Sequence, residues 1–94
     1  MNRYAHTFYV KCPSNGKRIA YHLTIEAQGM IMVEEILAAC AAHKAGYHEA
    51  IADDLVARLG GQHVLKAHHH GVHITTERVR LGSTGAPTPL PAPG

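Results

Sequence analysis

The sequence lacks any long hydrophobic run. Its longest apolar stretches, residues 30–33 and 36–42, are separated by Glu34 and Glu35, so neither approaches the roughly 20 residues that cross a bilayer. The first residues also lack the apolar core of a secretory signal. We therefore expect a cytoplasmic protein with no membrane partner.

The sequence also has few cysteines and a low net charge. Two cysteines, Cys12 and Cys40, are too few for a disulfide framework, and we expect both to be free thiols. A formal net charge of only +2 disfavours nucleic acid as the main partner. The abundant residue is histidine: the nine histidines are neutral donors and acceptors at pH 7 and become cations below about pH 6.5.

The length and composition indicate one small globular domain. Of the 94 residues, 46% are hydrophobic, which is enough for a core, but a core of this size is marginal and we expect oligomerisation to support it. Residues 82–94 contain four of the five prolines and no charge. We therefore expect a domain over residues 1–81 and a disordered tail over 82–94.

The first part of the chain predicts a β-hairpin. Residues 4–11 and 19–26 alternate apolar and polar side chains, which is typical of half-buried strands. Between them, Pro13 fixes one φ angle, and Asn15-Gly16 tolerates the positive φ angles that close a hairpin. The two strands should therefore pair in antiparallel fashion.

After the two strands, the spacing of the apolar residues becomes that of an α-helix. Val33, Ile36, Leu37 and Cys40 recur at helical spacing, and Gly46 ends this helix. A second helix is expected from about Tyr47 to Gly60-Gly61, and residues 62–81 read as strand broken near Gly71. This order predicts an α+β fold, ββααββ, in which a four-stranded antiparallel sheet carries two antiparallel helices on one face.

The histidines of residues 68–73 are the first candidate site. In a strand His68 and His70 share one face, and a third metal ligand from His22 or Cys12 would complete a zinc site. No complete zinc motif is present, and the alternative is that these histidines are solvated or hydrogen-bonded strand residues.

Glu49 is the second candidate. It falls in the first turn of the second helix, where the helix dipole favours a carboxylate, and borders an apolar stripe. A fixed carboxylate can accept two parallel N–H bonds from a cyclic amidine such as the edge of a guanine or pterin. The alternative is that Glu49 only stabilises the helix.

Three further residues are candidates for catalysis. Cys12 follows Lys11 and precedes Lys17, two cations that can lower a thiol pKa and favour a nucleophile. His43 and His48 are candidate proton-transfer groups. Phe8, Tyr21 and Cys40 are assigned instead to packing.

Several strings resemble the tunnelling fold (T-fold) of 6-pyruvoyl- and 6-carboxytetrahydropterin synthases and dihydroneopterin aldolase. The string Gln28-Gly29-Met30-Ile31-Met32 before the first helix resembles a Gly-Met segment of the synthases, and residues 49–59 resemble the second helix of both families. The resemblance implies a ring of subunits whose sheets join into a barrel, with Glu49 holding a pterin or purine-like heterocycle at subunit interfaces. Cys12 and His43 lie near the places of the synthases' catalytic cysteine and histidine.

The chain also departs from that pattern. Asn15-Gly16-Lys17 stands where the synthases carry His-Gly-His for zinc, and no acidic residue follows His43 in the shortened loop. The first hypothesis is a homo-oligomeric enzyme of pterin, folate or deazapurine metabolism, such as a tetrahydropterin synthase-like lyase or an aldolase. The alternative is a non-catalytic oligomeric or metal-binding, histidine-rich module that retains the fold but not the active site, with zinc as one possible metal.

Overall fold

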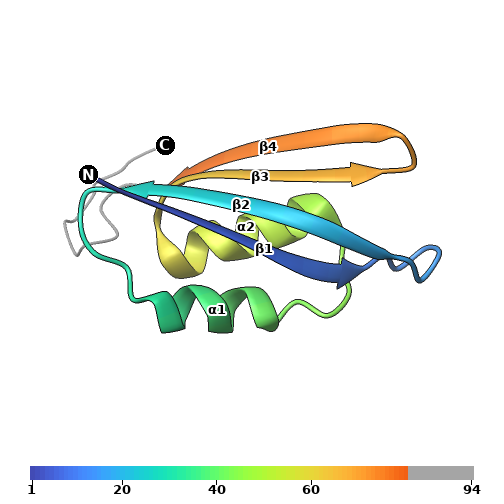
Figure 1. Ribbon diagram of the computed structural model, residues 1–94, viewed down its shortest axis with the longest axis horizontal. Helices are drawn as coiled ribbons and strands as arrows, with labels where there is room; N and C mark the ends of the chain where they lie inside the picture. The colour runs from blue at the N-terminus through green and yellow to red at the C-terminus, as the bar shows by residue number, and fades with distance from the viewer. Residues whose placement is uncertain (81–94) are drawn as a thin grey trace, which may run out of the picture.

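The computed structural model describes residues 1–80, and its elements follow the expected order. They are β1 (Asn2–Lys11), β2 (Arg18–Ala27), α1 (Val33–Ala41), α2 (His48–Leu59), β3 (Gly61–His69) and β4 (Val72–Arg80). Both helices lie on the same side of the sheet and run in opposite directions (Figure 1). The α+β fold class is thereby confirmed, whereas the tail expected over 82–94 lies outside the described residues.

The strands form one antiparallel sheet in the order β1-β2-β3-β4. The first hairpin pairs without interruption from Asn2 opposite Ala27 to Lys11 opposite Arg18, as its period-two pattern predicts. The break expected near Gly71 is the β3–β4 turn, with His69 paired to Val72. Strands β1 and β4 are therefore the two edges of the sheet within one chain.

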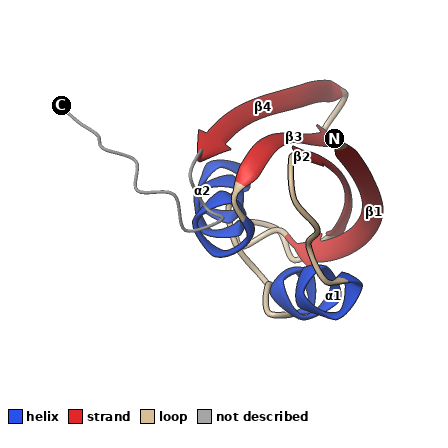
Figure 2. Cartoon of the chain, turned by 90° about the vertical axis from the view of Figure 1, so that its left-hand side faces the viewer, coloured by secondary structure: helices blue, strands red, loops and turns tan. Residues whose placement is uncertain are grey.

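The core lies between the sheet and the helices. Alternate residues of β1, β2 and β3 are buried, and Leu55 and Ile51 of α2 complete the core at 0% and 1% exposure. Figure 2, an end view, shows the curved sheet with α2 near β3 and β4 and α1 near β1. Phe8, Tyr21 and Cys40 are buried, which confirms their assignment to packing.

The first helix buries a narrower face than its sequence suggests. Ile36 and Cys40 are buried, but Val33 and Leu37 remain about half exposed. The reason is positional, because α1 packs at the edge of the layer beside α2 and β1 rather than under the centre of the sheet. Within residues 1–80, neither helix has the length and hydropathy needed to span a bilayer.

Candidate functional site

Two backbone hydrogen bonds bring Cys12 and the start of α2 to one end of the molecule. The Lys11 N–H donates to the Lys44 carbonyl at 2.9 Å, and the Gly46 N–H donates to the Lys11 carbonyl at 3.3 Å. Cys12 directly follows Lys11, and α2 begins two residues after Gly46. We call this region, which comprises the β1–β2 turn and the first turn of α2, the Cys12 end.

The β1–β2 turn surrounds the Cys12 thiol with donors. Its backbone is closed by hydrogen bonds from Cys12 N–H to the Lys17 carbonyl and from Gly16 N–H to the Cys12 carbonyl, both 2.8 Å. The Cys12 Sγ lies 3.1 Å from the Ser14 Oγ. The Ser14 hydroxyl, aided by the N–H groups of Ser14 and Asn15, lowers the pKa of Cys12 although burial opposes the shift. These donors favour the nucleophilic thiolate.

Tyr21 and His48 lie on the inner side of the same end. The His48 Nε2–H donates to the Leu65 carbonyl at 3.1 Å, and its ring packs 5.3 Å from that of Tyr21. Burial lowers the pKa of His48, while burial and the nearby Cys12 charge raise the pKa of Tyr21. The Nδ1 of His48 is buried without a hydrogen-bond partner among residues 1–80. His48 is thus a neutral imidazole with a free lone pair.

Glu49 is exposed in the first turn of α2. Its charge contributes to raising the pKa of Arg78 on β4, chiefly raised by a 2.7 Å hydrogen bond to Asp53. Helix α2, which carries Glu49, packs against β4, the strand that forms one edge of the sheet.

His43 has an acidic partner that the loop sequence does not reveal. Its Nε2 lies 2.7 Å from the Asp54 Oδ2 of α2, and the Arg58 Nε contacts the same oxygen at 2.8 Å. Partial burial opposes ionisation of Asp54, but the hydrogen bonds from Arg58 and His43 prevail and lower its pKa. The sequence indicates only the Asp54–Arg58 pair, because a spacing of four residues places both side chains on one helix face. His43 lies beside the Cys12 end and is held by this pair.

The three histidines expected to bind metal each contact a different residue and do not meet. The His22 Nδ1 lies 2.9 Å from the Thr7 hydroxyl, the His68 ring stacks on His73 at 4.4 Å, and His70 contacts Asn15. Among residues 1–80, no three histidine, cysteine or acidic side chains gather closely enough to hold a metal ion. Within one chain, the structure offers no support for the expected zinc site.

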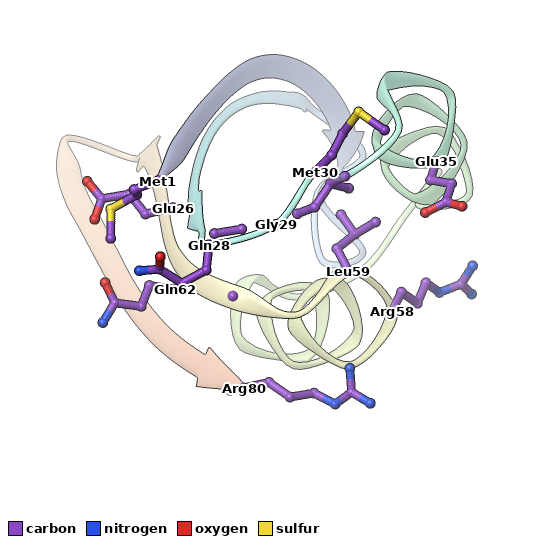
Figure 3. Close-up of a pocket in the computed structure, with 13 residues that line it drawn as sticks. Met1, Glu26, Gln28, Gly29, Met30, Glu35, Arg58, Leu59, Gln62 and Arg80 are labelled. Atoms are coloured by element: carbon purple, nitrogen blue, oxygen red, sulfur yellow. The ribbon is translucent and has the colours of Figure 1, made fainter. Parts of the chain in front are cut away.

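A hollow of about 350 Å³ lies at the opposite end of the sheet (Figure 3). Its lining includes Glu26 and Arg58, which already pair with Arg3 and Asp54. Among residues 1–80, no thiol and no histidine lines it. We therefore place the candidate site at the Cys12 end, where a donor-bound thiol, a neutral imidazole and a carboxylate come from adjoining elements.

Comparison with solved structures identifies a related fold. The chain is similar to the crystal structure of the archaeosine synthase QueF-Like in the apo form, with a TM-score of 0.68 and 16% sequence identity over 82% of this chain and 89% of that one. No protein-family model matches the sequence, and no curated protein matches it. At this level of identity the likeness concerns the fold, which is that of the T-fold-like ββααββ domain.

Proposed function

We propose that this protein binds a deazapurine or a similar heterocycle through Glu49 and modifies it with Cys12 as nucleophile. The observation that carries the proposal is the pair of backbone hydrogen bonds joining Lys11 to Lys44 and Gly46, which brings the Cys12 turn beside the start of α2. The similar fold of an archaeosine synthase, an enzyme of deazapurine chemistry, favours a deazapurine over a pterin.

Glu49 would recognise the heterocycle by its hydrogen-bonding edge. An ionised carboxylate accepts two parallel N–H bonds from the ring N–H and 2-amino group of a guanine-type base. Adenine lacks this pair of donors and should be rejected, because the carboxylate would lose a partner on binding it. The low net charge favours a free base over a polynucleotide.

Cys12 would form a covalent bond with an electrophilic carbon of the bound base. The thiol proton is lost to solvent, the thiolate Sγ adds to a carbon that is multiply bonded to nitrogen or oxygen, and the displaced π pair moves to that heteroatom, which takes up a proton from solvent. The lowered pKa of Cys12 and the Ser14 hydroxyl 3.1 Å from its sulfur favour the attacking thiolate. His43, held by Asp54, is the candidate for assisting proton transfer.

A second copy of the chain would complete the site. Strands β1 and β4 end the sheet on either side, and unpaired strand edges readily add a neighbouring strand. Pairing of β4 with β1 of the next copy would place that copy's residues opposite Glu49. This arrangement supports a homo-oligomeric ring with ligands between subunits.

Calorimetric titration with 7-deazaguanine, neopterin and adenine tests the proposal. We expect 7-deazaguanine to bind best and Glu49→Gln to weaken its binding by roughly ten- to a hundredfold, the effect of losing a hydrogen bond to a charged group. Glu34→Gln is the matched control, since Glu34 is an exposed first-turn glutamate of the other helix. It should leave binding unchanged.

Alkylation of Cys12 by iodoacetamide tests whether both residues belong to one site. Bound 7-deazaguanine should slow the alkylation in the wild type and should not do so in Glu49→Gln. If no heterocycle binds the wild type, or if Glu49→Gln binds equally well, the proposal is refuted. The non-catalytic alternative, which retains the fold without the active site, predicts neither binding of the heterocycle nor protection of Cys12.

A further inference from the structure

One side-chain hydrogen bond connects the two hairpin turns at the Cys12 end. The Asn15 Nδ2 lies 2.7 Å from the His70 Nε2, although the two residues are 55 positions apart in the chain. The Asn15 Oδ1 accepts the Lys17 N–H at 2.9 Å, so the amide nitrogen is the atom that faces His70. Asn15 therefore donates, and His70 accepts as a neutral imidazole through Nε2.

His70 has a left-handed backbone conformation, which is uncommon for residues other than glycine. His70 has φ +54° and Gly71 has φ +82°, the pattern of a tight hairpin turn with two left-handed central residues. Asn or Gly is favoured at the first of these positions, and another L-residue costs about 1 kcal/mol or more. The turn tolerates a histidine, and at this position the ring reaches Asn15.

We propose that His70, acting through Asn15, is a positioning residue that holds the β1–β2 turn with its donors against the Cys12 sulfur. The inference deepens the proposed function, because it concerns the same nucleophile. Asn15 ties the turn on both sides, through Lys17 within it and through His70 outside it. Without His70, the turn would keep only its internal bonds and the donors around Sγ would be less well fixed.

The groups around Cys12 determine how readily its thiolate forms. Ser14 and the N–H groups of the turn stabilise the thiolate, and Lys11 and Lys17 flank it in the chain. Tyr21 and His48 lie on the inner side, and His69 packs against His70 with ring centroids 4.2 Å apart. Loosening the turn weakens the contacts of Ser14 and the turn N–H groups with the sulfur and leaves the other groups in place. The thiolate should therefore become less favoured.

The test is the rate of Cys12 alkylation by iodoacetamide as a function of pH, read by peptide mass spectrometry. We expect His70→Ala and His70→Asn to slow alkylation near pH 7 by about three- to tenfold and to move the midpoint of the profile upward, by up to about one pH unit. His70→Gln, whose side-chain oxygen can accept from Asn15, should restore most of the rate. His68→Ala is the matched control, because His68 stacks on His73 instead.

The Asn variant separates positioning from folding. Asn suits the turn better than His but has a shorter side chain, so a purely structural function of His70 predicts a stable protein with wild-type Cys12 reactivity. That result, or an equal loss in His68→Ala, would overturn the inference alone. A wild-type Cys12 no more reactive than Cys40 would overturn both this inference and the nucleophile of the proposed function.

Discussion

Acidification should destabilise the fold through two buried histidines, His48 and His63. Their side chains are 9% and 3% exposed, and each donates Nε2–H to a carbonyl, at 3.1 Å to Leu65 and at 2.7 Å to Gly60. Both Nδ1 atoms are buried without a partner among residues 1–80. Burial lowers the pKa of both rings below the ordinary value of 6.5, because protonation would place an uncompensated charge in the core.

The sign and size of the change in folding stability with pH follow from proton linkage. Between the folded pKa and 6.5, the unfolded chain binds more protons than the folded one, so stability is complete above the unfolded pKa and is lost as pH falls. From pH 7 to pH 5.5, a histidine that stays neutral in the folded state loses about 1.3 kcal/mol, which sets a ceiling of about 2.5 kcal/mol for the pair. This is a large part of the 5–15 kcal/mol typical of a domain.

Urea unfolding at several pH values between 5.5 and 7.5 measures the effect. His63→Gln and His48→Gln should each lower stability at pH 7 yet flatten its pH dependence by up to half, because glutamine does not titrate. His22→Gln is the control, since His22 is exposed, and its slope should match the wild type. A wild-type stability that stays constant over this range, or Gln variants with the full slope, would refute the reasoning.

Three further changes probe the core, the backbone and the thiols. Leu55→Ala should lower the free energy of unfolding by about 3–4 kcal/mol in urea titrations, because Leu55 is fully buried. Gly61→Ala should cost about 2 kcal/mol or more, because Gly61 has φ +86° and a Cβ there would lie 2.8 Å from a backbone oxygen of β2, whereas Gly71→Ala, with open space around it, should cost about half as much. At pH 7.5, iodoacetamide should alkylate Cys12 at least about tenfold faster than Cys40, whose pKa burial raises to about 11, and equal rates in mass spectra would contradict this.

The fold was predictable because its elements have strong local signals. The period-two pattern of residues 4–11 and 19–26 and the Asn15-Gly16 turn define the first hairpin, and the observed register follows from them. Glycines end both α2 and the β3 strand where the chain reverses. These features depend on neighbours in sequence, so a single sequence reveals them.

The candidate site was predictable only in part, because its contacts join distant segments. Cys12, His48 and Glu49 could be chosen for their chemistry, but their proximity depends on the bonds from Lys11 to the loop before α2. The partner of His43 lies 11 residues away on another element, and the Asn15–His70 bond spans 55. Residue type indicates what each group can do, whereas only tertiary structure shows which groups meet.

Dilution should abolish ligand binding at Glu49 but leave the reactivity of the Cys12 thiol unchanged. The thiol environment is built within one chain, by Ser14 and the turn, whereas Glu49 lies on α2, which packs against the open edge strand β4 that a second copy would cover. As protein concentration falls and the proposed ring dissociates, 7-deazaguanine should cease to protect Cys12 from alkylation, while the excess reactivity of Cys12 over Cys40 should persist. Size-exclusion chromatography at the same concentrations gives the subunit number. Protection that survives in a proven monomer would show that one chain binds the base by itself, contrary to a site shared between subunits.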